Sequence, residues 1–298
     1  MSRLSRMTSV TARSRVLVLL LVALPLAAST LLAQAPLAPA AIALRTHEAL
    51  LALDRYLETW NSRDPAIWAT SLHYPHVRPG AGPFEVSQTA AEYAAGVNFA
   101  QTISTGWHHS EWVSRSVLQV GPAKVHVAGS WQRFTAEGRP QAVSAITYIV
   151  TNVNNRWGIQ ARFAAGTGVV DAQAAARNAS AGRDAVTAFF QAWNGHDADI
   201  VANAIHYPHV RIADGLVEVW HSKDEFLKGS EPGRQRTWYQ TRIDEMTVAQ
   251  TTSNGANLTV KTSRLGRDGR VLATDEGVFL VALRDGSWKV QARSTMGT

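Results

Sequence analysis

The sequence contains no cysteine in 298 residues. Disulfide bonds, thiolate zinc sites and lipid attachment to a cysteine are therefore excluded, and stability must come from packing. The sequence also lacks a phosphate-binding glycine loop, a nucleophile elbow and a dinucleotide-binding fingerprint. We therefore expect the protein to use no cofactor.

The chain also carries little net charge outside its N-terminal segment. The formal net charge is +6, but four arginines lie within the first fifteen residues, a stretch that contains no acidic residue. The rest of the chain carries about two excess positive charges, which excludes the charge pattern of a nucleic-acid-binding protein. A composition with 46% hydrophobic and 17% charged residues is typical of a globular protein.

Residues 1–40 are predicted to be a signal peptide followed by an Ala/Pro linker. Arginines precede the apolar run VLVLLLVALPLAA at 16–28 and the small-residue stretch that follows it. The AQA at 33–35 fits signal cleavage, although Pro36 disfavours it, so a cut near Ala40 or a retained anchor stays open. No other apolar run is long enough to span a bilayer. We expect an exported protein, periplasmic or secreted, with no stable membrane span after processing.

The remainder of the chain is a repeat. LHYPHVR at 72–78 returns as IHYPHVR at 205–211, WNSRDPAIW at 60–68 as WNGHDADIV at 193–201, and WGIQAR at 157–162 as WKVQAR at 288–293. Repetition over this length indicates two copies of one fold. We predict two domains, at 41–168 and 169–298.

Each copy opens with an apolar stripe at helical spacing, followed by Asp64 or Asp197 as the N-cap of a short second helix. A third helix is expected at 89–105 and at 222–228. Strands are expected near 108–120, 124–134, 143–152 and 156–163, with counterparts in the second copy. The predicted fold class is α+β: two tandem cone-shaped domains, each with three helices packed on a curved, mainly antiparallel sheet.

A hairpin turn at Asp214-Gly215 fixes a strand register. It places Arg211 opposite Glu218, His209 opposite Trp220, Val210 opposite Val219 and Ile212 opposite Val217. A turn at Ala81-Gly82 places Arg78 opposite Glu85 in the same way. Alternation then gives one face to the aliphatic residues and the other to Tyr207, His209, Arg211, Glu218 and Trp220.

These features resemble the nuclear-transport-factor-2-like superfamily and, within it, the SnoaL-like group. The resemblance rests on the helix ending W-N-x-x-D, the Y-P-H-V-R strand with its glycine turn, and the closing strand W-x-[IV]-x-x-R. It implies a cone-shaped fold and an internal pseudo-dimer formed through the two sheets. The superfamily contains ketosteroid isomerase, scytalone dehydratase and non-catalytic modules, so the resemblance leaves the function open.

The polar face of the hairpin supplies the candidate site residues. The candidates for catalysis are His76, His209, Tyr74 and Tyr207, and those for ligand binding are His73, Arg78, Trp107, His206, Arg211, Glu218, Trp220 and Trp238. In one interpretation this face is a surface or a domain interface, held by the Arg–Glu pair and by His209 packed on Trp220. In the other it lines a pocket, where arginine holds an anionic or carbonyl group and histidine moves protons.

Two other chemistries are disfavoured by strand geometry. The histidines of H-x-x-H point to opposite faces of a strand, so we expect no metal site. For the same reason Asp244-Glu245 and Asp275-Glu276 cannot act as acid pairs.

The predicted function is binding of a small, largely apolar molecule in a cone cavity. Any catalysis would be cofactor-free acid–base chemistry of the isomerase, lyase or hydrolase type, and the sequence does not decide whether the protein is an enzyme. The alternative is a non-catalytic interaction or assembly module that uses the sheets and hairpins.

Overall fold

The structure is a computed structural model that describes residues 37–80, 84–167, 170–229 and 238–296. The predicted signal peptide, the AQA cleavage site and the Ala81-Gly82 turn lie outside these residues. The first helix begins at Pro39, so the segment predicted as a linker up to residue 40 overlaps its first residues. Within the described residues, no helix is both long enough and apolar enough to cross a membrane.

The first repeat consists of four helices and a six-stranded sheet among its described residues. Its elements are α1 (Pro39–Asn61), α2 (Pro65–Ala69), β1 (Leu72–Arg78), β2 (Glu85–Ser87), α3 (Ala90–Gly96), α4 (Phe99–Ser104), β3 (His109–Val120), β4 (Lys124–Phe134), β5 (Pro140–Val153) and β6 (Arg156–Thr167). The strand order is β2-β1-β6-β5-β4-β3, and β1 runs parallel to β6 while the other neighbours are antiparallel.

The second repeat follows the same plan. Its elements are α5 (Ala172–Asn194), α6 (Ala198–Asn203), β7 (Ile205–Ala213), β8 (Leu216–Trp220), α7 (Lys223–Gly229), β9 (Gln240–Thr252), β10 (Gly255–Leu265), β11 (Val271–Arg284) and β12 (Ser287–Thr295). The strand order β8-β7-β12-β11-β10-β9 is that of the first sheet. The predicted tandem α+β fold is therefore confirmed.

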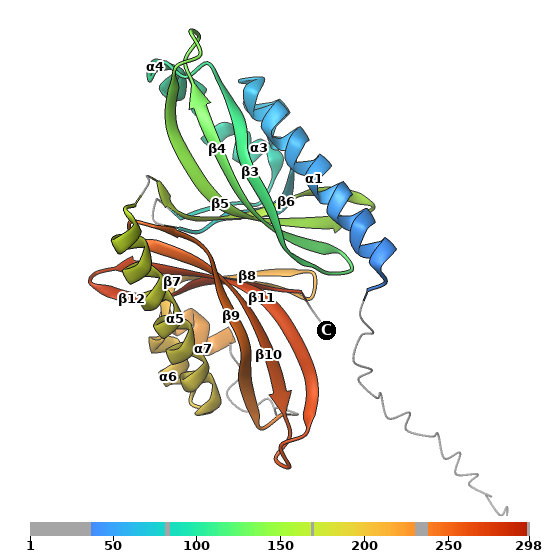
Figure 1. Ribbon diagram of the computed structural model, residues 1–298, viewed down its shortest axis with the longest axis vertical. Helices are drawn as coiled ribbons and strands as arrows, with labels where there is room; N and C mark the ends of the chain where they lie inside the picture. The colour runs from blue at the N-terminus through green and yellow to red at the C-terminus, as the bar shows by residue number, and fades with distance from the viewer. Residues whose placement is uncertain (1–36, 81–83, 168–169, 230–237, 297–298) are drawn as a thin grey trace, which may run out of the picture. The chain divides into compact units, whose positions relative to one another are not determined.

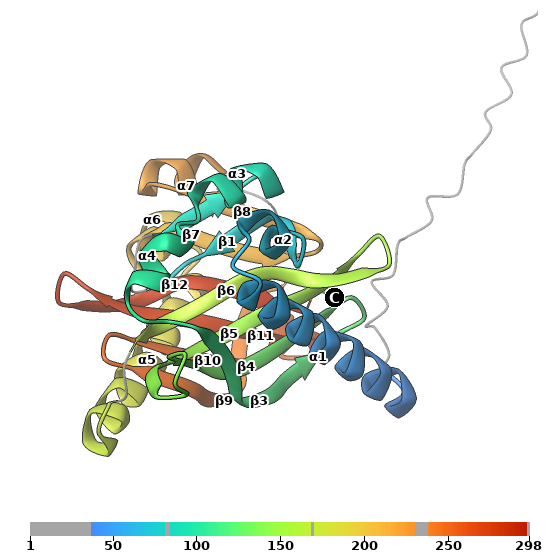
Figure 2. The same cartoon turned by 90° about the horizontal axis from the view of Figure 1, so that it is seen from above.

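The long helices cover one face of each sheet. Helix α1 lies across β3 to β6, and α5 lies across β9 to β12 (Figure 1). Helices α2 and α3 lie against each other, and α3 also contacts β2 at the edge of the first sheet (Figure 2). Between helices and sheet lies a core for each repeat, which we call the first cone and the second cone.

The motif W-N-x-x-D fixes the end of the long helix. The Asn61 amide donates to the Ser110 carbonyl and accepts from its N–H, both at 2.9 Å, and Asn194 holds Thr241 in the same way at 2.8 Å. Asp64 caps α2 by accepting two backbone N–H groups at 2.8 and 3.2 Å. Asp197 caps α6 with the same two contacts, so both predicted caps are confirmed.

The third helix of the first repeat was predicted as one element at 89–105 and is two. Helix α3 ends at Gly96 and α4 begins at Phe99. Asn98 makes the break, because its side chain accepts the Gln101 N–H at 3.1 Å and caps the new helix. In the second repeat α7 lies where the helix was predicted, and the residues equivalent to α4 are outside the described part of the chain.

The predicted hairpin register is confirmed in both repeats. Arg211 pairs with Glu218, and the other three predicted pairs of β7 with β8 are also present. Arg78 pairs with Glu85 on β1 and β2. The alternation of faces follows, but the aliphatic face does not cover the core of its own domain.

That aliphatic face packs against the other repeat. A single buried cluster joins residues of both sheets: Val77, Ile149, Ala161, Phe163, Val210, Ile212, Val278, Leu280 and Ala292. The polar face of β1 and β7 therefore turns inward, toward the helices. Sequence alternation defines two faces, but it cannot tell which face meets the helices and which meets the partner sheet.

The contact between the sheets has a pseudo-twofold character, as an isologous dimer interface does. His126 on β4 accepts the Ser294 hydroxyl of β12 at 2.9 Å. Asn257 stands at the equivalent place on β10 and donates to the Phe163 carbonyl of β6 at 3.0 Å. Gln119 and Gln250, also equivalent, each hold one of these side chains. The expected internal pseudo-dimer is built from these contacts.

We predict that His126 makes the protein sensitive to acid. Burial lowers the pKa of His126 well below its ordinary value, so between that pKa and about 6.5 only the unfolded chain binds the proton. The free energy of unfolding must then fall as pH drops below about 6.5, by up to about 1.4 kcal/mol per pH unit for this group. His126→Asn installs the residue of the second repeat and should make this dependence shallower in urea unfolding at pH 7, 6 and 5.

The control is His47→Asn, at an exposed position on α1. Equal pH dependence of the free energy of unfolding in His126→Asn and the unmutated chain would contradict a neutral, buried His126.

Candidate functional site

A buried arginine occupies the first cone. Arg162 of β6 is 5% exposed, and its guanidinium donates to the Tyr56 hydroxyl at 3.0 Å, to the Tyr93 hydroxyl at 2.9 Å and to His76 Nε2 at 3.2 Å. His76 Nδ1 lies 3.1 Å from the Ile159 carbonyl. His76 must donate through Nδ1 and accept through Nε2, which makes it the neutral tautomer. The arginine is thus satisfied from within the protein.

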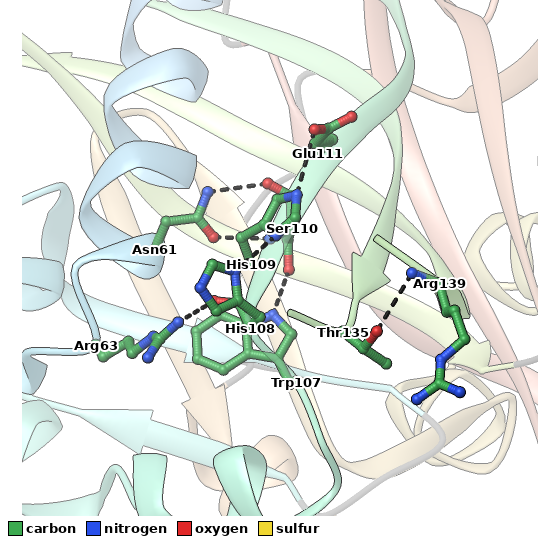
Figure 3. Close-up of polar contacts among 9 residues, drawn as sticks. All are labelled: Asn61, Arg63, Trp107, His108, His109, Ser110, Glu111, Thr135 and Arg139. Atoms are coloured by element: carbon green, nitrogen blue, oxygen red, sulfur yellow. Dashed lines mark hydrogen bonds and ion pairs between the residues drawn. The ribbon is translucent and has the colours of Figure 1, made fainter. Parts of the chain in front are cut away.

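Aromatic rings fill the rest of the first cone. Trp68 and Tyr93 lie against the Arg162 guanidinium, and the same core contains Trp60, Phe99, Trp107, Trp112, Trp131 and Tyr148. Trp107 was predicted to bind a ligand. Figure 3 shows its indole directed at Ser110, to which it donates at 3.0 Å, and it is only 2% exposed. Trp107 is therefore placed as a packing residue.

The second cone holds the equivalent arginine without its partners. Arg293 of β12 is 9% exposed, and its guanidinium lies 5.1 Å from the Phe189 ring and 5.4 Å from the Trp193 ring. Phe189, Phe226 and Phe279 stand where the first repeat has Tyr56, Tyr93 and Tyr148. Three hydroxyl groups are therefore missing. Within the described residues Arg293 forms no hydrogen bond or ion pair.

His209 is similarly unengaged. It is fully buried and stacks on Trp220 with ring centroids 5.9 Å apart, as predicted. The backbone of Val290 and Gln291 faces its ring, but neither ring nitrogen has a hydrogen-bond partner of normal geometry among the described residues. In the first cone the corresponding nitrogens of His76 are both occupied.

The two carboxylates whose charges act on Arg293, Glu218 and Asp275, are paired with other arginines. Glu218 pairs with Arg211, which also holds Asp214 at 3.1 Å. Asp275 lies 3.6 Å from Arg264. Neither carboxylate comes within ion-pairing distance of Arg293 in the described residues, so the buried cation is left without a counterion.

The pKa values of the two arginines move in opposite directions. Burial lowers the pKa of Arg293 to about 9, assisted by the nearby charge of Arg211. Burial also acts to lower the pKa of Arg162, but Tyr56, Tyr93 and Tyr148 outweigh it and raise this pKa above the ordinary value. The charged form is stabilised in one cone and destabilised in the other.

The second cone is also filled by smaller side chains. Val201, Ile243 and Thr262 stand where the first repeat has Trp68, Trp112 and Trp131. At one position the exchange is reversed, because Trp220 replaces Ser87. Losing three indoles and gaining one leaves the second cone with less side chain to fill it.

The two predicted tyrosines use their hydroxyls for structure. Tyr74 donates to the Ala69 carbonyl at 2.9 Å, and Tyr207 donates to the Ala202 carbonyl at 3.1 Å. Each bond satisfies a carbonyl at the end of the short helix before the strand. Burial raises the pKa of both tyrosines to about 12. Neither hydroxyl is free to donate to a ligand carbonyl.

His73 and His206 lie outside the cones. His73 Nδ1 is 2.8 Å from the Thr151 hydroxyl, and His206 Nε2 is 3.1 Å from each of two carbonyls, those of Ala282 and Ser287. His73 and His76 thus point to opposite faces of β1, as the alternation predicts. Among the described residues, no group of three or more His, Asp or Glu side chains is placed to hold a metal ion.

The Arg–Glu pairs form as predicted at the ends of the hairpins. Arg78 and Glu85 are 2.9 Å apart with side chains 39% and 46% exposed, which makes them a surface pair of small energetic value. Arg211 and Glu218 are more buried. Trp238, the last predicted residue, lies 4.9 Å from the Arg264 guanidinium. The structure therefore brings His209 and Trp220 to the second cone and leaves His73 and His206 elsewhere.

Arg162 and Arg293 were not among the predicted site residues. Both end the repeated W-x-[IV]-Q-A-R, so the signal was present in the sequence. Recognising it required knowing that this arginine points inward and that tyrosines distant in the chain surround it in one repeat only.

The fold and these two cores define the class: a tandem α+β protein whose two curved sheets share an interface and enclose separate cones. Residues 47–167 match the family described as NTF2-like protein (DUF6841). The first repeat is thus an NTF2-like domain, and the second repeats its strand order.

Solved structures resemble single repeats. An NTF2-like protein with a cystatin-like fold from Novosphingobium aromaticivorans is 17% identical, with 45% of this chain and 88% of that chain covered and a TM-score of 0.36. A ketosteroid isomerase-like protein from Erwinia carotovora atroseptica is 21% identical, with coverages of 40% and 94% and a TM-score of 0.30. An NTF-2 like protein of unknown function from Shewanella oneidensis MR-1 is 15% identical, with coverages of 39% and 95% and a TM-score of 0.33. No curated protein matches the chain.

We predict that the hydroxyls around Arg162 stabilise the fold. Tyr56→Phe and Tyr93→Phe each remove an acceptor from a buried guanidinium, and each should lower the free energy of unfolding by about 1.5–3 kcal/mol, the range for hydrogen bonds to charged groups. Urea unfolding of the two variants measures this loss. Tyr239→Phe, at a position 49% exposed, is the control. Losses no larger than that of the control would mean that Arg162 does not depend on these hydroxyls.

Proposed function

We propose that this chain is an exported binding protein in which the second cone holds a small, largely apolar molecule and the first cone is a structural copy. The supporting observation is the contrast between two equivalent buried arginines. Arg162 has three acceptors within hydrogen-bonding distance, whereas Arg293 has none among the described residues. Buried polar groups in native proteins are normally satisfied, so one without a partner needs an explanation, and a bound ligand is the one proposed here.

The walls of the second cone favour an apolar molecule. Phe189, Phe190, Phe226 and Phe279 are buried there with aliphatic neighbours, and small-molecule sites are mostly apolar with a few convergent polar groups. Arg293 and His209 would be those polar groups. The replacement of indoles by Val201, Ile243 and Thr262 supports the presence of space.

Binding is better supported than catalysis. Burial, together with the charge of Arg293, lowers the pKa of His209 well below its ordinary value, which makes it a weak base at neutral pH. His76 is excluded as a base because both of its nitrogens are engaged. Of the four predicted catalytic residues only His209 has no hydrogen-bond partner among the described residues, and its ring serves a ligand more directly as a hydrogen-bonding group.

Export is proposed from the leader. An arginine-bearing start, the apolar run at 16–28 and the small residues after it support a signal peptide. The destination would be the periplasm or the medium.

In the alternative function the sheets would bind other proteins, but one face of each sheet already packs against the other repeat. The outer faces of the two sheets bury each other through Val77, Phe163, Val210 and Leu280. The surfaces through which such domains could pair are thus occupied by the internal pseudo-dimer, which favours ligand binding as the function of the cone.

We predict that the purified full chain carries a small molecule in the second cone. Native mass spectrometry should detect one adduct per chain that is lost on denaturation. Thr262→Trp installs the indole of the first repeat and should abolish the adduct, because the ring fills the space. Val271→Trp adds the same ring at a position 47% exposed and should retain it.

Melting curves of both variants verify that they are folded. An adduct retained in Thr262→Trp would place the ligand elsewhere. An unliganded chain whose melting temperature is unchanged by sterol-like, polyketide-like and aromatic carbonyl compounds would contradict the proposal and favour the assembly module.

A further inference from the structure

We infer that the ligand of the second cone is a monocarboxylate with an apolar body, and that its carboxylate binds the Arg293 guanidinium. The inference rests on the proposed function, since it requires a ligand in this cone. It assigns the head group of that ligand, which neither the fold nor the family specifies.

Arg293 carries a positive charge at a buried position. A guanidinium stays protonated in proteins, so this side chain carries its charge into a site that is 91% shielded from solvent. A buried charge without compensation costs several kcal/mol. Cation–π contact with the Phe189 and Trp193 rings offsets part of that cost. Its N–H groups have no acceptor among the described residues, and an anionic ligand would supply one.

The charges around Arg293 favour a ligand with one negative charge. The other two arginines of this region are already paired, Arg211 with Glu218 and Asp214, and Arg264 with Asp275. Among the arginines that the structure describes in this region, Arg293 is therefore the one available. A dianion such as a phosphate monoester would bring a second charge that no described side chain compensates, and Glu218 and Asp275 would repel it. The site matches a single negative charge.

The shape of the guanidinium favours a carboxylate as the head group of the ligand. A guanidinium presents two parallel N–H groups that fit the two oxygens of a carboxylate. The surrounding side chains of Phe189, Phe226, Phe279 and Trp193 offer rings and no further charge. A planar carboxylate attached to an apolar or aromatic body satisfies both the cation and its walls.

The comparison between repeats supplies the decisive variants. Phe189→Tyr with Phe226→Tyr gives Arg293 the two hydroxyls that Arg162 has, so the protein would satisfy its own cation and compete with the carboxylate. Arg293→Met removes the charge and keeps an apolar side chain. Lys261→Met, which removes a cation that is 41% exposed, is the matched control for net charge.

The experiment measures binding of two sets of probes to the full chain by titration calorimetry. One set is naphthalene-2-carboxylate, its methyl ester and naphthalene-2,6-dicarboxylate; the other is decanoate, decanamide and decan-1-ol. Each monocarboxylate should bind about 10- to 100-fold tighter than its neutral analogue, the ratio expected for charge-assisted hydrogen bonds, and the dicarboxylate should bind more weakly than the monocarboxylate. Arg293→Met and the double tyrosine variant should both remove this preference, and Lys261→Met should keep it.

The outcomes separate this inference from the proposed function. Equal binding of acids and neutral analogues, unchanged in Arg293→Met, would overturn the carboxylate assignment and leave a ligand-binding cone. If no probe binds, the co-purified adduct decides: a carboxylic acid supports the inference, and a neutral molecule overturns it. If neither a probe nor an adduct is found, the proposed function itself fails. Should Arg293→Met not fold, the double tyrosine variant tests the same point with the charge retained.

Discussion

A buried guanidinium at the end of the closing strand is the constraint around which each cone is organised. The guanidinium is charged at neutral pH, so its N–H groups need acceptors wherever the strand carries them. In the first cone Tyr56, Tyr93 and His76 supply those acceptors, and the surrounding indoles exclude water. In the second cone the tyrosines are phenylalanines, and the guanidinium lies against the Phe189 and Trp193 rings with no hydrogen bond among the described residues. The first cone, a structural core, has three tyrosine hydroxyls and several indoles that the second cone, the candidate binding site, lacks.

The contact between the sheets explains how two copies of one fold can differ so much inside. Both sheets bury their outer faces against each other through aliphatic residues and through the equivalent polar pairs centred on His126 and Asn257. Residues that alternate along the strands separate this contact from the cone interior. The interior of one repeat can therefore change without disturbing the interface.

Much of the local structure follows from the sequence, because it depends on neighbouring residues. Asp64 and Asp197 cap the helices they precede, and the turn at Asp214-Gly215 alone is enough to place Arg211 opposite Glu218. The break at Asn98 was not predicted, since an asparagine competes with helix continuation only when its side chain reaches the following N–H. Tyr74 and Tyr207 were predicted as candidates for catalysis, but both hydroxyls donate to carbonyls of the preceding helix.

The sequence by itself determined the repeat, the order of helices and strands, the hairpin register and the two faces of the hairpin strands. These depend on periodicity, on turn chemistry and on distances of a few residues along the chain. Only the tertiary structure decided that the polar face turns into the cone and that His73 and His206 lie outside it. It also decided that Arg162 has three acceptors while Arg293 has none in the part of the chain that the structure describes. The physical reason is that hydrogen-bond satisfaction of a buried charge depends on acceptors from several elements, here Tyr56 of α1, His76 of β1 and Tyr93 of α3, which only the folded chain brings around one guanidinium.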